Sequence, residues 1–174
     1  MNSFGEVVKE FKFCPICSAS LVERTKDRIE CGDACGFVHY NNPTPVAAMV
    51  VEYEGCIVLA HNRAWQGDFY GLITGFIDHR ESPVDCAVRE VKEELDLDAA
   101  TPNLIGVYGF ERLNQIIIGY HVEATGTITL NEELDRYKLV PPEACVAWPT
   151  GTGFALRDWL RMRGIEPEML KLPG

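Results

Sequence analysis

GFIDHRESPVDCAVREVKEELDL, residues 75–97, is the most informative segment of this chain of 174 residues. Ser82 followed by Pro83 indicates a helix start, because serine caps a helix and proline suits its first turn. The apolar side chains that follow recur at spacings of three and four residues, which predicts an amphipathic helix to about Leu95. They are Val84, Ala87, Val88, Val91 and Leu95.

The polar face of this predicted helix carries three glutamates. Glu90, Glu93 and Glu94 stand at positions i, i+3 and i+4, which converge on one helix face. Like charges at this spacing destabilise an isolated helix, so the group needs a compensating charge, and carboxylate oxygens suit Mg²⁺ or Mn²⁺. Arg89 could hold one carboxylate in place, and Gly75 would let a backbone carbonyl approach closely. The alternative is an ordinary solvated acidic helix face.

The spacing of these residues resembles the Nudix box, G-x5-E-x7-R-E-U-x-E-E-x-G-U, where U is aliphatic. Eight of the nine specified positions match. The resemblance implies a divalent-metal site built by the three helix glutamates and the Gly75 carbonyl, with Arg89 orienting Glu90. Glu81 would bind metal or support a ligand. The metal ligands implied are Gly75, Glu81, Glu90, Glu93 and Glu94.

Three positions depart from the pattern common in that family. Asp96 replaces the box glycine, Ile73 stands where a proline is frequent, and Arg80 precedes the first box glutamate in place of a glycine. The box glycine would end the helix in a left-handed conformation, which aspartate adopts at some cost. We therefore expect Asp96 to change the helix exit and not the metal site.

The resemblance also implies a reaction. Bound metals would neutralise a diphosphate and lower the pKa of a bound water that attacks one phosphorus. The general base varies in this superfamily and often lies outside the box. Glu132 and Glu133 are candidates here, and we favour Glu133, although an acidic run of this kind is as often a solvated turn.

The remaining pattern indicates an α/β fold. Strands are predicted at 46–51, 56–60, 104–110, 116–123 and 137–140, with a short helix from Pro141 and an amphipathic helix at 154–163. Alternating strands and helices favour a mixed sheet with helices on both sides, the α/β/α sandwich of the Nudix fold.

Four of the seven cysteines cluster near the N-terminus. Cys14 and Cys17, then Cys31 and Cys35, form two close pairs of the kind that supplies four thiolates to tetrahedral Zn²⁺. Iron in the same cage, or four reduced thiols without metal, are the alternatives. Composition changes near residue 42, so we expect a zinc ribbon at 1–42 and a Nudix domain at 43–174.

A zinc ribbon followed by a Nudix box is similar to NADH pyrophosphatases and to related enzymes acting on FAD or ADP-ribose. The S-Q-P-W-P-F-P motif of the NADH enzymes is absent from residues 98–115, which favours ADP-ribose, FAD or a related dinucleotide. Trp65, Phe69, Tyr70 and Tyr108 could stack on a base, although aromatic residues near strands are more often core. The expected function is Mg²⁺-dependent cleavage of a P–O–P bridge to two monophosphates.

The charge balance bears on partners. The net charge is -10, and residues 1–42 carry five basic against six acidic side chains, so no nucleic-acid polymer is expected as a partner. No apolar stretch reaches the ~20 residues of a membrane helix, and the first residues lack a signal-peptide core, so a cytoplasmic protein is expected. The family resemblance also allows a homodimer. The alternatives in function are a catalytically inactive nucleotide-binding module and an isomerase of isoprenoid diphosphates.

Overall fold

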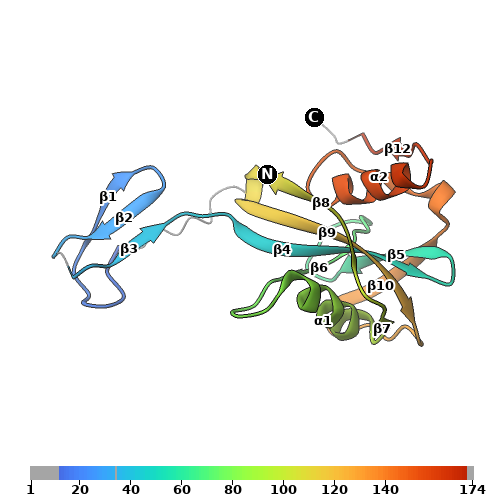
Figure 1. The fold of residues 1–174 in the computed structure, drawn as a ribbon, viewed down its shortest axis with the longest axis horizontal. Helices are drawn as coiled ribbons and strands as arrows, with labels where there is room; N and C mark the ends of the chain where they lie inside the picture. The colour runs from blue at the N-terminus through green and yellow to red at the C-terminus, as the bar shows by residue number, and fades with distance from the viewer. Residues whose placement is uncertain (1–11, 34, 172–174) are drawn as a thin grey trace. The chain divides into compact units, whose positions relative to one another are not determined.

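The computed structural model describes residues 12–33 and 35–171 (Figure 1). The chain divides into two compact units, one running to Thr44 and including Glu111–Asn114, the other formed by 45–110 and 115–174. The first eleven residues of the predicted ribbon lie outside the described residues. The boundary between residues 42 and 43 remains a prediction.

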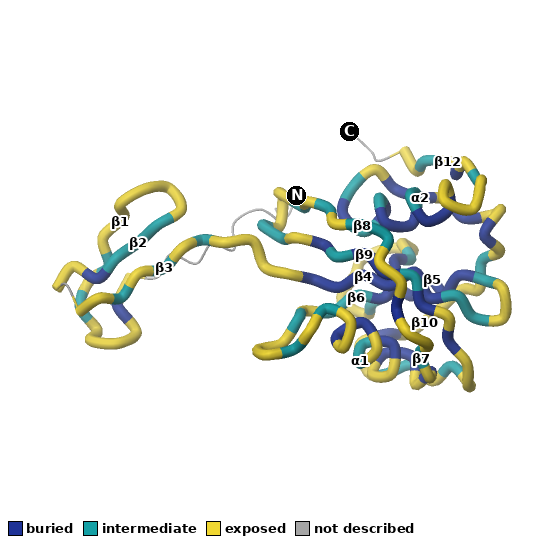
Figure 2. Tube along the Cα trace, viewed as in Figure 1, coloured by how far each residue is buried: buried dark blue, intermediate teal, exposed yellow. Residues whose placement is uncertain are grey.

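The smaller unit is an antiparallel three-stranded sheet with almost no apolar core. Its strands are β1 (Leu21–Thr25), β2 (Arg28–Cys31) and β3 (Val38–Tyr40), paired in that order. Among its described residues, only Cys14 and Cys31 are buried (Figure 2). A unit of this size with so little buried apolar surface needs another source of stability, and the cysteine cluster is the candidate.

The larger unit is built on a curled, mixed sheet that has seven strands within the described residues. The order is β10-β5-β4-β9-β7, with β6 also paired to β4 and β8 to β9. The strands are β4 (Thr44–Tyr53), β5 (Cys56–Asn62), β6 (Ile73–Phe76), β7 (Asp98–Ala99), β8 (Asn103–Phe110), β9 (Gln115–Thr125) and β10 (Leu134–Val140).

Two helices cover opposite faces of this sheet (Figure 1). They are α1 (Pro83–Leu95) and α2 (Gly153–Met162). In β4, Met49 and Val51 join the core that contains α1, whereas Val50 joins the core that contains α2. Successive strand residues point to opposite faces, so one strand serves both cores. The predicted α/β/α sandwich is confirmed.

Short elements complete both units; residues 111–113 belong to the smaller unit and the others to the larger one. The 3-10 helices are η1 (Glu111–Leu113) and η2 (Pro142–Ala144), and β11 (Val146–Ala147) pairs in parallel with β12 (Glu168–Met169). The short helix predicted after Pro141 is η2, whereas β10 begins at Leu134, three residues before the predicted start. None of the helices in the described part of the chain is long and apolar enough to cross a membrane.

Candidate active site and metal centre

The predicted boundaries of α1 are confirmed in detail. Ser82 precedes the helix, and its hydroxyl oxygen accepts a hydrogen bond from the Asp85 backbone N–H at 3.1 Å. Asp96 ends the helix in the left-handed conformation, with φ 55° and ψ 26°. Its backbone N–H donates to the Lys92 carbonyl at 2.9 Å, and its carboxylate lies 2.7 Å from the Lys92 ammonium. The aspartate thus adopts the conformation expected of the glycine it replaces.

A tight turn places Glu81 at the entrance to α1. The Glu81 N–H donates to the Asp78 carbonyl at 3.1 Å, and the Asp78 N–H donates back to the Glu81 carboxylate at 2.9 Å. Arg80, the third residue of this turn, has φ 66°, while His79 is not in the left-handed region. This pattern is that of a type II turn, which favours glycine at its third position. Both departures from box-type glycines therefore occupy left-handed backbone.

Arg89 binds three of the predicted metal-ligating carboxylates at once. Its guanidinium makes two bonds to Glu81, at 2.7 and 2.9 Å, and one each to Glu90 at 2.6 Å and Glu93 at 2.9 Å. It also donates to the Phe76 carbonyl at 3.1 Å. The expected contact between Arg89 and Glu90 is present, but the two-bond contact is with Glu81.

Gly75 lies directly against the Glu90 side chain. A Cβ atom built at position 75 would overlap the Glu90 carboxyl group, so any other residue would force that carboxylate to move. The Gly75 carbonyl, which the family resemblance implies as a metal ligand, lies 3.9 Å from the Cys86 thiol. In the sheet, Gly75 is paired with Ala47 of β4, which fixes its position relative to α1.

The electrostatics of the carboxylates differ sharply. Hydrogen bonds from Arg89 lower the pKa of Glu81 to about 2. Burial raises the pKa of Glu90, and burial together with the charges of Glu90, Glu133 and Glu93 raises that of Glu94 to about 8. The charged neighbours that act on Glu94 are all carboxylates, so this end of the site is short of positive charge.

The donor set fits Mg²⁺ or Mn²⁺. Carboxylate and carbonyl oxygens are the ligands these hard cations prefer, and a divalent ion would supply the charge that the group around Glu94 lacks. The carboxylates of Glu90, Glu93 and Glu94 do not, however, form a group with ligand atoms within 4.8 Å of one another in the described chain. Arg89 holds two of them, so metal binding would have to redirect those side chains.

Glu133 is brought next to this carboxylate group. It is exposed, immediately before Leu134 at the start of β10, and it contributes to the raised pKa of Glu94. Its backbone N–H is held by the Asn131 side chain at 3.0 Å, and its carbonyl accepts from the Arg63 N–H at 2.9 Å. Glu132, the other candidate base, is also exposed.

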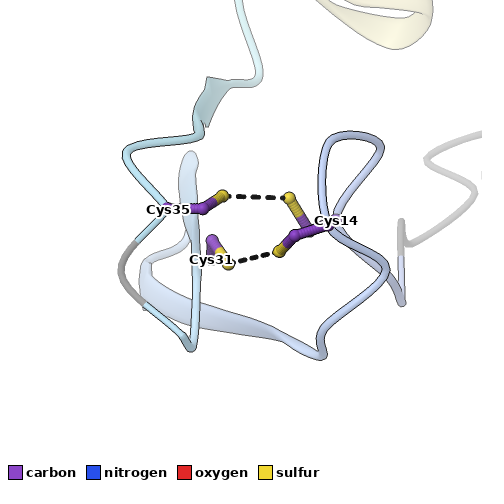
Figure 3. Close-up of side chains that lie close together, drawn as sticks. Cys14, Cys31 and Cys35 are labelled. Carbon is purple, nitrogen blue, oxygen red and sulfur yellow. Dashed lines mark hydrogen bonds between the residues drawn. The ribbon is translucent and has the colours of Figure 1, made fainter.

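The four predicted zinc-binding cysteines converge. Their sulfur atoms all lie within 4.8 Å of one another, with Cys14 3.5 Å from Cys35 and Cys17 3.4 Å from Cys31. Figure 3 shows the sulfurs of Cys14 and Cys35 directed toward each other. A hydrogen bond from the Cys35 backbone, the largest of several contributions, helps lower the pKa of Cys31 to about 7, whereas one from the Ala19 backbone is outweighed by hydrogen bonds shared with Cys31 and Cys35, which raise the pKa of Cys17 to about 12. Among these two thiols, Cys31 therefore favours the thiolate that metals bind. The arrangement fits tetrahedral Zn²⁺.

A third group of polar side chains was missed from sequence. Ligand atoms of Glu52, His121 and Glu123 also lie within 4.8 Å of one another. Glu52 is already bonded to His121 at 2.8 Å and to Arg163 at 2.7 Å, so its charge is compensated by protein. Alternation along β9 places His121 and Glu123 on one face, but the pairing of β4 with β9 that adds Glu52 has no local sequence signal.

Comparison with known proteins places these features in a family. The family model described as NUDIX domain matches residues 42–161. A protein of Stutzerimonas stutzeri named NAD-capped RNA hydrolase NudC is 28% identical over 125 residues, 72% of this chain and 45% of that protein. A protein of the same name from Vibrio parahaemolyticus is 30% identical over 52% of this chain and 35% of its own length. The chain spans about half the length of such relatives, or less.

Solved structures share the fold. A NUDIX hydrolase from Nitrosomonas europaea has a TM-score of 0.73 at 20% identity, covering 92% of this chain and 99% of its own. An ADP-ribose pyrophosphatase from Streptococcus suis has a TM-score of 0.58 at 18% identity, covering 74% of this chain and 100% of its own. At these identities the likeness supports the fold alone.

Proposed function

This chain belongs to the NUDIX family, and from that premise we propose that it is a pyrophosphohydrolase that requires Mg²⁺ or Mn²⁺. Its substrate is a nucleoside diphosphate linked to another group, of the ADP-ribose, FAD or NADH class. It cleaves the P–O–P bridge to give two monophosphates. A structural Zn²⁺ bound by Cys14, Cys17, Cys31 and Cys35 stabilises the smaller unit.

One observation carries this proposal: the carboxylates of the box surround a single guanidinium and still leave a buried glutamate uncompensated. Arg89 bonds to Glu81, Glu90 and Glu93, whereas Glu94 is only 8% exposed and faces further negative charge. A nucleotide-binding module that does not use metal would gain nothing from this arrangement, because crowding carboxyl groups around a buried glutamate costs stability whether that glutamate is ionised or forced to keep its proton.

The residues of the site would have distinct roles in the reaction. Glu90, Glu93 and Glu94, with the Gly75 carbonyl, would hold the divalent cation. When bound, that cation supplies charge neutralisation at the diphosphate and acidifies a water molecule. Glu81 holds the Arg89 guanidinium beside Glu90 and Glu93 through two hydrogen bonds, so Arg89 would remain next to the ligand carboxylates when they turn toward the cation.

Glu133 is our choice for the general base. It is exposed to solvent, so it can exchange protons, and it lies close enough to Glu94 to affect its pKa. Hydrogen bonds from the backbone of residue 133 to Asn131 and Arg63 fix the position of the backbone from which this side chain extends. A base in this position would take a proton from the attacking water at the edge of the metal site.

The substrate is assigned by class. The relatives named NAD-capped RNA hydrolase support an NAD-type dinucleotide, free or at the end of RNA. The absence of the S-Q-P-W-P-F-P motif and the net charge of -10 weigh against NADH specificity and against a long RNA, respectively. We therefore place free dinucleotides such as ADP-ribose and FAD first.

The test is product analysis with purified protein. ADP-ribose, FAD, NADH and NAD-capped RNA are incubated with Mg²⁺ or Mn²⁺, and AMP, the partner monophosphate or, for capped RNA, 5′-monophosphate RNA is measured. Glu93→Gln and Glu94→Gln should each lower kcat by about 100-fold or more, because a metal-ligand charge is removed without a change of shape. Glu143→Gln, at an exposed glutamate of η2, is the matched control.

Two results would contradict the proposal. Absence of monophosphate products from the whole panel would favour the inactive binding module. Activity of both glutamine variants within threefold of wild type would remove the metal-site assignment even if hydrolysis occurs.

A further inference from the structure

The segment between β5 and β6 presents two neighbouring aromatic side chains to solvent. Trp65 is 39% exposed and Phe69 is 38% exposed, and their ring centroids are 5.5 Å apart. We propose that Trp65, supported by Phe69, is the surface on which the nucleobase of the substrate stacks. This inference rests on the proposed function and adds the subsite that recognises the base.

The segment is held firmly to the sheet. Ala60 of β5 and Gly71 exchange two backbone hydrogen bonds, both 2.9 Å long. His61, only 3% exposed, bonds through one ring nitrogen to Asp135 at 2.7 Å and through the other to the Gly67 carbonyl at 2.9 Å. An aromatic side chain on such a fixed segment loses little freedom when a ligand binds, which favours affinity.

The two rings are held in place by packing against other residues. Phe69 packs edge-on against Trp148, which is buried, at a centroid distance of 5.2 Å. A Cβ atom at Gly71 would lie 2.9 Å from the Trp65 ring, so the indole rests on backbone that only glycine leaves open. Trp65 is therefore positioned by packing and yet keeps a large part of its ring available. An exposed, fixed indole is well suited to stack on a planar base.

This aromatic pair adjoins the carboxylate site. The Arg63 N–H donates to the Glu133 carbonyl at 2.9 Å, and Glu133 lies close enough to Glu94 to act on it electrostatically. Trp65 follows two residues after Arg63, so the two Cα atoms are at most roughly 7.6 Å apart. Trp65 therefore stands on backbone close to that of Glu133, within the length of a dinucleotide from the metal site.

The charge around the pair suits a nucleotide. Lys138 lies 3.9 Å above the ring of Tyr70, and Arg136 lies 5.8 Å from the same ring. Arg136 also pairs with Asp68 at 2.9 Å, which offsets part of its charge. Lys138 and Arg136 thus form a cationic group beside Tyr70, the residue after Phe69, in a chain of net charge -10. Such a group attracts an anionic ligand and not an apolar protein surface.

The experiment is calorimetric binding of AMP and of ribose 5-phosphate, which lacks a base, to the full chain. Trp65→Ala should weaken AMP binding by roughly 5- to 150-fold, the range that base stacking on an aromatic side chain supports. Ribose 5-phosphate binding should change by less than twofold. Trp65→Tyr, which keeps a ring, should retain AMP binding within threefold. Tyr137→Ala, at an aromatic residue of β10 with 42% exposure, is the control and should bind AMP as wild type does.

Each alternative outcome overturns the inference. Equal binding of AMP by wild type and Trp65→Ala would show that the indole does not stack on the base. An equal loss of AMP binding and ribose 5-phosphate binding would show that Trp65 acts only through the structure of the segment. In that case Phe69→Ala, with its fold retained, should bind AMP as wild type does. A change in oligomeric state with unchanged AMP binding would assign the pair to a contact between protein chains. The hydrolase proposal is tested separately, because AMP binding through Trp65 does not require turnover.

Discussion

Replacing Arg80 with glycine should stabilise the protein. Arg80 occupies a left-handed conformation, φ 66°, at the third position of the turn that carries Glu81. A side chain in that conformation costs about 1–2 kcal/mol, and a new glycine adds unfolded-chain entropy worth about 0.5–1 kcal/mol. The net gain is about 0.5–1 kcal/mol, which for a chain of this size raises Tm by about 1–4 °C.

Urea unfolding followed by tryptophan fluorescence measures this gain for the larger unit, which contains Arg80. The three tryptophans, Trp65, Trp148 and Trp159, all belong to the larger unit, so the signal does not report on the zinc ribbon. Arg80→Ala is the matched control, because it removes the same exposed side chain but keeps the Cβ that makes the conformation unfavourable. If Arg80→Gly is no more stable than Arg80→Ala, backbone strain at this turn is not the cause and the reasoning fails.

Three further substitutions test other parts of the structure. Gly75→Ala should lower kcat by about 100-fold and weaken Mn²⁺ binding, because the new methyl group overlaps the Glu90 carboxyl; unchanged Mn²⁺ affinity would contradict this. Asp96→Ala should cost about 1 kcal/mol in urea unfolding, since alanine tolerates the left-handed conformation poorly and loses the exposed pair with Lys92, whereas Asp96→Gly should be close to neutral. Metal analysis of the wild type should find about one zinc per chain and Cys31→Ser should abolish it, whereas retention of zinc by the variant would refute the four-cysteine site.

Local patterns accounted for the helix at the centre of the site. Ser82, Pro83 and the apolar spacing predicted α1 with its observed start and end, and helical geometry alone brought Glu90, Glu93 and Glu94 to one side. These features depend on residues close together in the chain, so they are readable without the fold.

The contacts that complete the site depend on the fold. The bonds from Arg89 to Glu81 require the Asp78–Glu81 turn. This turn cannot be recognised from the sequence, because Arg80 stands at a position that favours glycine. The proximity of Glu133 to Glu94 requires β10 to lie beside β5. Strand pairing joins residues far apart in sequence, and single-sequence periodicity carries no information about which strands become neighbours.

The central strand has a consequence for how the protein resists unfolding. Because β4 sends Met49 and Val51 into one core and Val50 into the other, removing either helix layer exposes a strand on which the opposite layer depends. The two layers therefore behave as one cooperative unit. The acidic helix face, unfavourable by itself, is maintained by the stability of the whole sandwich, so a destabilising change beneath α2 reduces the population of molecules with an assembled site without touching any site residue.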